Sequence, residues 1–201
     1  MNELPKDELV KQEILASALG LFQRYGLAKT TMEDIAEAAG KGKSTLYYYY
    51  KSKEEIYGAV IKKQIESILA EVAAAVENSL TAADKLRTYF SSYVSSANFK
   101  YNTVLTDVLR SELKDNKKST FSEEKKLIDE NEILFVKKIL LLGTNTGEFR
   151  KLTDEELDAL STVLVISFRS LMMEMIFDHD YKADKAISVL LDTLIKGLQA
   201  K

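Results

Sequence analysis

Apolar residues recur along this chain at helical spacing almost throughout. Between Leu9 and Tyr25 they fall at steps of three and four and form one stripe, which predicts a helix that Gly26 ends. Strand-type alternation is hard to find, and the chain contains a single proline and eight glycines. The pattern therefore predicts an all-helical protein.

The segment after this first helix predicts two short helices. Thr30 or Thr31 can cap the first of them, because an acidic residue follows each threonine by three positions. Gly40 ends this helix after about two turns, and a second helix spans about residues 43–50. Two short helices joined by a glycine turn form a helix-turn-helix pattern.

The rest of the chain predicts one long helix and five further ones. Ser52, followed three residues later by Glu55, starts a helix that runs to Asn78 and is long enough to join an N-terminal head to the rest. The other helices are expected at about 82–97, 101–113, 120–142 (ending at Gly143), 153–177 and 182–199. We expect a domain of residues 1–52 that contains the helix-turn-helix, and a helical domain of residues 53–201.

Composition narrows the chemistry. The chain has no cysteine, which excludes disulfides and thiolate sites, and its one histidine, His179, lies between two aspartates that do not face one point with it on a helix. No glycine-rich phosphate loop is present, so neither an enzyme, a metal site nor a cofactor is expected. No apolar run is long enough to span a membrane, and the charged N-terminus lacks a signal region, so we expect a cytoplasmic protein.

Charge is distributed unevenly. The net charge is −3, but the segment 39–63 carries six lysines and two glutamates, a local excess of +4. A charge cluster of this kind is typical of a solvated helix face and is also the electrostatic pattern of a nucleic-acid contact. The four consecutive tyrosines in the same segment, Tyr47 to Tyr50, bear on this choice.

Successive residues of a helix turn by about 100°, so four tyrosines in a row cannot share one face. Tyr50 lies about 40° from Leu46 and is predicted to be a core ring. The opposite, exposed side carries Ser44, Thr45 and Tyr48, with Tyr47 and Tyr49 on its flanks. A helix in the major groove of DNA needs this arrangement, since central side chains reach base edges while flanking hydroxyls and lysines reach phosphates. The alternative, a helix packed on all sides, would bury three phenol hydroxyls that each need a partner.

A dense pattern through residues 10–57 adds to this interpretation. It consists of Ile14, Ala18, Leu21, Phe22, Gly26, Thr30, Thr31, Ile35, Ala36, Ala39, Gly40, Lys43, Ser44, Thr45, Leu46, Tyr47, Tyr49, Lys51, Ser52, Lys53, Glu54 and Glu55. The pattern resembles the N-terminal domain of TetR-type transcriptional regulators. It departs from the family at Lys41, where a small apolar residue is usual, at Gly42, where serine or alanine is frequent, and at Tyr50, where phenylalanine is more usual. The GEFR sequence at 147–150 resembles the connection before the family's dimerisation helices.

The resemblance implies roles for individual residues. Thr31, with Thr30 beside it, corresponds to a phosphate contact at the start of the second helix. The base-reading positions correspond to Lys43, Ser44, Thr45 and Tyr48, and further phosphate contacts to Tyr47, Tyr49 and Lys53. The implied function is that of a transcriptional regulator, more often a repressor than an activator, that binds a palindromic operator in double-stranded DNA.

In the same family the C-terminal helices pair two subunits and bind a small effector. Composition alone leaves the apolar stretch 163–177 as either an intrachain core or a dimer seam; the resemblance favours a homodimer through the helices at about 154–177 and 182–199. Apolar residues that are either core or effector pocket are Phe90, Tyr93, Phe135, Phe168 and Met172. Few charges interrupt these faces, so we expect an apolar or amphipathic effector. The competing hypothesis is a helical scaffold or small-molecule-binding bundle that has lost DNA binding.

Overall fold

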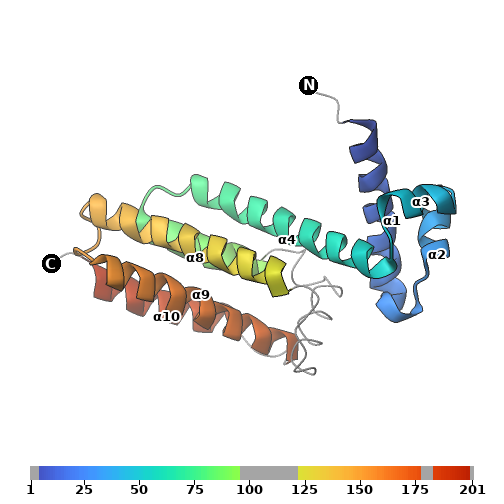
Figure 1. The fold of residues 1–201 in the computed structure, drawn as a ribbon. Coiled ribbons are helices and arrows are strands. Elements are labelled where there is room, and N and C mark those ends of the chain that lie inside the picture. Colours follow the sequence, from blue (N-terminus) through green and yellow to red (C-terminus); the bar gives the residue numbers. More distant parts are fainter. Residues whose placement is uncertain (1–4, 96–121, 178–182, 200–201) are drawn as a thin grey trace. The chain divides into compact units, whose positions relative to one another are not determined.

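The structure is a computed structural model that describes residues 5–95, 122–177 and 183–199 (Figure 1). The described ranges contain eight helices: α1 (Lys6–Lys29), α2 (Met32–Ala38), α3 (Lys43–Tyr49), α4 (Lys53–Glu77), α5 (Ala82–Ser95), α8 (Ser122–Asn145), α9 (Asp154–Phe177) and α10 (Ala183–Leu198). Extended pairing within these ranges amounts to one isolated bridge, between Phe149 and Gln199. The predicted all-helical fold is confirmed. The predicted helix at 101–113 and His179 lie outside the described residues.

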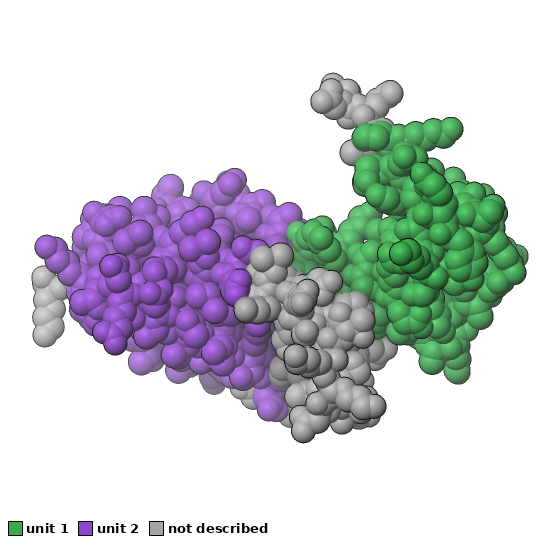
Figure 2. Space-filling view, viewed as in Figure 1, with its two compact units in different colours: residues 1–67, 101–116 green, residues 68–100, 117–201 purple. Residues whose placement is uncertain are grey.

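The packing contacts divide the chain inside α4, between Ser67 and Ile68, into the two units that Figure 2 colours separately. The sequence predicts a domain boundary after Ser52, at the start of α4. The first turns of α4 stay with the N-terminal unit because they supply its core. The Tyr57 ring meets the Phe22 ring edge-on, with 5.0 Å between centroids, and Ile56 and Val60 are fully buried. The later turns of α4 belong to the second unit.

Helix α1 extends beyond its predicted limits at both ends. It begins at Lys6, because the carbonyl of Pro5 accepts hydrogen bonds from the N–H groups of Glu8 and Leu9 at 2.9 and 3.1 Å. The predicted stop at Gly26 is a sharp break, with φ 74° and ψ 166°, in the left-handed region that glycine adopts without a Cβ penalty. One more turn follows before α2.

Four helices form the second unit together with the end of α4: α8 packs on α5 and α9, and α10 packs on α5 and α9. Its largest fully buried side chains include Leu86, Phe90, Leu140, Phe149, Leu157 and Ile195. The predicted cap at Thr153 is present, since its hydroxyl accepts the Glu156 N–H at 3.2 Å. None of the described helices is both long and apolar enough to cross a membrane.

The prediction that the helix before residue 143 ends at Gly143 is wrong. Helix α8 continues to Asn145, and the turn comes at Gly147, where φ is 76°. Gly143 is required for a different reason: a Cβ placed on it would lie 2.2 Å from Cδ2 of the buried Phe149 ring. Glycine therefore lets the segment after α8 pack directly against the helix backbone.

The 147–150 segment fastens one end of the second unit. The Glu148 carboxylate accepts hydrogen bonds from the backbone N–H groups of Ala82 and Ala83, at 2.7 and 3.0 Å, and so caps the start of α5. The Arg150 N–H donates to the Leu198 carbonyl at 2.7 Å, near the end of α10. This short segment thus joins α5, α8 and α10.

Candidate nucleic-acid interface

Local interactions build the helix-turn-helix of the first unit. Thr31 caps α2 as half of a capping box: its hydroxyl accepts the Asp34 N–H at 3.2 Å, and the Asp34 carboxylate accepts the Thr31 N–H at 2.9 Å. The Thr31 hydroxyl and N–H lower the pKa of this carboxyl. At the other end, Gly40 has φ 63° and Lys41 donates its N–H to the Ala36 carbonyl at 2.9 Å, which ends α2 and turns the chain toward α3.

Helix α3 presents its tyrosines in the directions that the sequence predicts. Leu46 is fully buried and Tyr50 is 8% exposed, so these two residues form the core side. Tyr48 is 77% exposed and Tyr47 51% exposed on the outside. Burial raises the pKa of the Tyr50 hydroxyl, whereas Tyr48 keeps its ring and hydroxyl at the surface. The outward face of α3 therefore consists of tyrosine, serine and lysine side chains that are exposed and do not belong to the core of this unit.

Several polar groups on and beside this face have carboxylate partners from α1 and α2. The Tyr49 hydroxyl donates to Asp7 Oδ1 at 2.8 Å, which raises the pKa of the tyrosine. The Lys43 ammonium lies 2.6 Å from Glu33 Oε1 and lowers the pKa of that carboxyl. Ser44 is exposed and Thr45 is half-buried.

Two predicted contact residues lie in different surroundings from those expected. Thr30 is 1% exposed, and its hydroxyl donates to the Gly26 carbonyl at 2.8 Å, so it is not a surface residue beside Thr31. The Thr30 hydrogen bond connects the residue that follows α1 to Gly26, the residue at which the helix is broken.

Lys53 is the second of these residues. Its ammonium is hydrogen-bonded to the carbonyls of Leu27, Ala28 and Thr30 at 2.9, 3.3 and 2.9 Å. Carbonyls at the end of a helix carry partial negative charge and lack helical partners, so an ammonium with three donors satisfies them. Lys53 thus closes the end of α1 from the first turn of α4. The partners lie 23 to 26 residues away, and no local pattern in the sequence reveals them.

Comparison with known proteins shows which family has a similar helix-turn-helix segment. The sequence model described as bacterial regulatory proteins, tetR family, matches residues 14–60, which span the helix-turn-helix and the first turns of α4. Residues 14–60 are thus similar to the N-terminal domain of TetR-family regulators. RutR of Escherichia coli K12, an HTH-type transcriptional regulator, is 42% identical over 64 residues, or 32% of this chain and 30% of that protein. The matched segment thus spans about a third of the length of that relative.

Two other similarities extend over nearly the whole chain. DhaR of Mycobacterium sp. strain GP1, an HTH-type transcriptional repressor, is 22% identical over 94% of both proteins. A transcriptional regulator of Cytophaga hutchinsonii is 26% identical in its crystal structure, with a TM-score of 0.76 over 94% of this chain and 98% of that one.

The second unit brings most of the predicted pocket residues together. The Phe168 ring lies 4.9 Å from the Phe90 ring and 5.4 Å from the Tyr93 ring, measured between centroids. Met172 is buried one helical turn after Phe168 on α9. Phe135 on α8 is half-buried, and its ring stacks on the Tyr89 ring with 5.2 Å between centroids. A shallow apolar depression adjoins Phe90 and Phe168 and is lined also by Leu164, Leu171, Ile187, Leu190 and Leu191.

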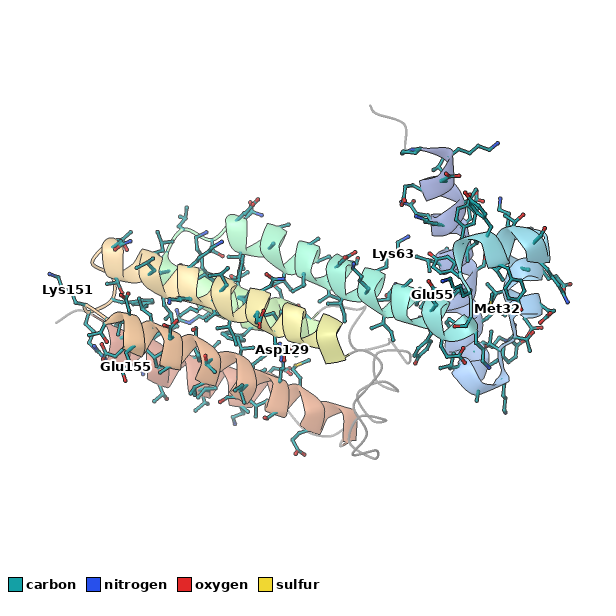
Figure 3. The ribbon with its side chains drawn as sticks, viewed as in Figure 1. Met32, Glu55, Lys63, Asp129, Lys151 and Glu155 are labelled. Atoms are coloured by element: carbon teal, nitrogen blue, oxygen red, sulfur yellow. The ribbon has the colours of Figure 1, made fainter. Side chains whose placement is uncertain are left out.

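A polar cluster lies inside this aromatic region, and the sequence interpretation missed it. The Arg169 guanidinium bridges Glu132 and Asp129 of α8, and the Tyr93 hydroxyl also donates to Glu132 (Figure 3 labels Asp129). Glu132 is 8% exposed, and burial raises the pKa of Tyr93. The available signal was Arg169 itself, a cation in the middle of an otherwise apolar stretch of α9. The described residues include no group of three acidic or histidine side chains placed to hold a metal ion.

Proposed function

We propose that this protein is a DNA-binding transcriptional regulator that reads a palindromic operator as a homodimer and leaves it on binding a small molecule. The observation that carries the proposal is the orientation of α3. The helix that follows the turn buries Leu46 and presents Tyr48 and Tyr47 to solvent. A helix whose exposed face offers hydroxyls, rings and lysines is suited to base edges and phosphates in the major groove.

The proposed contacts follow from the positions of the side chains. Lys43, Ser44, Thr45 and Tyr48 are assigned to base edges, and Thr31, Tyr47 and Tyr49 to phosphates. Thr30 and Lys53 are removed from the contacts that the sequence suggested, because the first is buried and the second binds three carbonyl oxygens of its own chain. Their proposed role is to hold α1, α2 and α4 in the positions that present α3.

Uncharged surface on the last two described helices supports a homodimer. Helix α9 exposes Val163 at 59% and Ile166 at 56%, and α10 exposes Val189 at 59% and Leu190 at 38%. Ala159, Ser170, Thr193 and Gly197 are also exposed on these two helices and carry no charge. Exposed apolar side chains of this kind are costly to leave in water, and a second copy of the same helices would cover them.

The aromatic region of the second unit supports an apolar or amphipathic effector. Phe90, Tyr93, Phe168 and Met172 are buried together, and Phe135 lies at the edge of the group. Helix α4 supplies buried residues to both units, Ile56 and Val60 to one and Val72 and Val76 to the other. It is therefore the segment through which an effector would change DNA binding, with a coupling of about 1–3 kcal/mol.

Selection of bound duplexes from a random library tests the proposal. We expect enrichment of a two-fold palindrome, and we expect Tyr48→Ala to weaken binding to it by about 1–3 kcal/mol. Tyr25→Ala is the matched control, because Tyr25 is also an exposed tyrosine of the first unit but lies on α1. Enrichment that Tyr48→Ala leaves unchanged would refute the assignment of α3.

The competing function is an effector-binding bundle without DNA binding. It shares the second unit and differs only in what α3 does. A dimeric, folded protein that enriches no sequence, before and after unfolding, ligand removal and refolding, would favour it. A reporter assay with candidate effectors distinguishes a repressor from an activator. An effector that raises reporter transcription would indicate a repressor, and one that lowers it would indicate an activator.

A further inference from the structure

Three carboxylates from α1 and α2 occupy donors on and beside the reading helix α3. Asp7 accepts the Tyr49 hydroxyl at 2.8 Å, Glu13 lies 2.7 Å from the Lys41 ammonium, and Glu33 lies 2.6 Å from the Lys43 ammonium. The residues of each pair are 42, 28 and 10 positions apart in the chain, so the fold, and not local sequence, brings them together. We call Asp7, Glu13 and Glu33 the carboxylate guard.

Two of these donors, Tyr49 and Lys43, belong to the DNA contacts proposed above, and Lys41 lies in the turn just before α3. A tyrosine hydroxyl has one proton to donate, and Tyr49 gives it to Asp7. The Lys41 and Lys43 ammonium groups each lie in direct contact with a carboxylate, which partly neutralises their field. A phosphate that approaches the same donors meets negative charge in the place where it needs positive charge.

All three pairs are accessible to solvent. The Lys43 and Glu33 side chains are 63% and 51% exposed, and the Glu13 side chain is 57% exposed, while its partner Lys41 is 27% exposed. Exposed ion pairs contribute little to folding, typically under about 1 kcal/mol, and high-dielectric solvent lets them exchange partners. The carboxylate guard therefore contributes little to the stability of the fold. It is well placed to compete with polyanions for the Tyr49, Lys41 and Lys43 donors.

We propose that the carboxylate guard lowers the affinity of this protein for duplex DNA by competing with the DNA for Tyr49, Lys41 and Lys43. The inference rests on the proposed DNA binding and adds a regulatory element to it: three acidic residues outside the reading helix set how strongly it holds any DNA. The protein thereby limits retention on non-operator sequence, where phosphate contacts supply nearly all the affinity.

The test compares Asp7→Asn with Glu8→Gln. Each change removes one negative charge from the first turns of α1, but Glu8 pairs with Lys11 of its own helix and does not touch α3. The two variants are thus matched in net charge, and they differ in whether the lost charge lies against the Tyr49 hydroxyl. We expect Asp7→Asn to bind both a scrambled duplex and the selected operator about twofold to fivefold more tightly than Glu8→Gln.

A triple variant enlarges the effect. Asp7→Asn, Glu13→Gln and Glu33→Gln together are compared with Glu8→Gln, Glu37→Gln and Glu54→Gln, three exposed acidic residues of the same unit. We expect the guard variant to bind duplex about tenfold or more tightly than its charge-matched control, since distant sites add. Thermal unfolding should give the same melting temperature for both proteins, which separates binding from folding.

A Tyr49→Phe variant tests whether the effect of Asp7 acts through its hydrogen bond with the Tyr49 hydroxyl. Without the hydroxyl, Asp7→Asn should no longer raise the affinity, because the competition at this donor has been removed. If Asp7→Asn equals Glu8→Gln, or if the guard variant binds DNA more weakly because the carboxylates orient Lys43 and Tyr49, the guard is refuted while the proposed function stands. If neither the wild-type protein nor the guard variant binds any duplex at low salt, the proposed function fails, and the guard fails with it.

Discussion

The two units of this chain use charged side chains in opposite ways. In the N-terminal unit, the carboxylates and lysines near α3 lie at the surface, where water and DNA can exchange with them. In the second unit, Glu132 is almost fully buried and bound to Arg169 and Tyr93. Surface charge can be redirected to a partner at little cost, whereas buried charge must keep its partner or destabilise the fold. Lys53 is the exception in the first unit, because its ammonium is used internally.

The largest effect that would sharpen this contrast is expected from Arg169→Met. The change leaves the Glu132 carboxylate without its cation, and removal of one member of a buried pair costs roughly 3 kcal/mol. Urea unfolding followed by circular dichroism measures the loss of unfolding free energy. In the double variant with Glu132→Leu most of the loss should return, because the Asp129 carboxylate that also loses its cation is 31% exposed, whereas the buried carboxylate is gone. Equal instability of the single and double variants would show that packing, and not charge, governs this position.

The next effect concerns packing in the same unit. Gly143→Ala would place a Cβ within 2.2 Å of the Phe149 ring, and overpacking of this kind costs about 1–3 kcal/mol. The control is Gly20→Ala in α1, where nothing lies within 4 Å of the added Cβ, and a gain of about 0.5–1 kcal/mol is expected from helix propensity. Calorimetric melting of both variants checks the opposite signs. A neutral Gly143→Ala would mean that Phe149 moves aside without cost.

Lys53→Met tests the exception in the first unit. Loss of the ammonium leaves the carbonyls at the end of α1 without their donors, and we expect a loss of about 1–2 kcal/mol in unfolding free energy. Duplex affinity should fall as well, but the slope of log affinity against log salt should stay unchanged, because no phosphate contact is removed. Lys51→Met, an exposed neighbour, serves as the control for charge alone. A slope reduced by about 0.9 would instead indicate a phosphate contact at Lys53.

The smallest effect is a pH dependence at the surface of the second unit. Hydrogen bonds from Arg150 and from the Thr153 N–H lower the pKa of Glu156 from 4.5 to about 2. A folded-state pKa below the unfolded value stabilises the protein above the unfolded pKa, and this stabilisation is lost as the pH falls toward 2. Glu156→Gln should therefore lower the melting temperature by about 1–2 °C at pH 6 and by nothing near pH 2.

Glu155→Gln is the matched control for this pH dependence, since Glu155 is the exposed neighbour in the same helical turn (Figure 3). It should show a smaller difference at pH 6. Curves for Glu156→Gln and wild type that stay parallel down to pH 2 would contradict the assigned ion pair.

The sequence by itself determined the features that depend on neighbours within one or two helical turns. The apolar stripe of α1, the Thr31 and Thr153 caps and the outward direction of Tyr48 all follow from spacing along one helix, and the structure has each of them. The same kind of short-range pattern accounts for the match of residues 14–60 to the TetR family model.

Only the tertiary structure decided which distant groups meet. Thr30 is buried at the end of α1, Lys53 reaches carbonyls more than twenty residues away, and Asp7 binds Tyr49 across 42 residues. Gly143 lies inside a helix because a ring from the following segment packs on it. A capping box or an amphipathic stripe is specified by a few adjacent residues, but a hydrogen bond between helices depends on how those helices pack. The geometry of packing, which no short pattern encodes, therefore selected these partners.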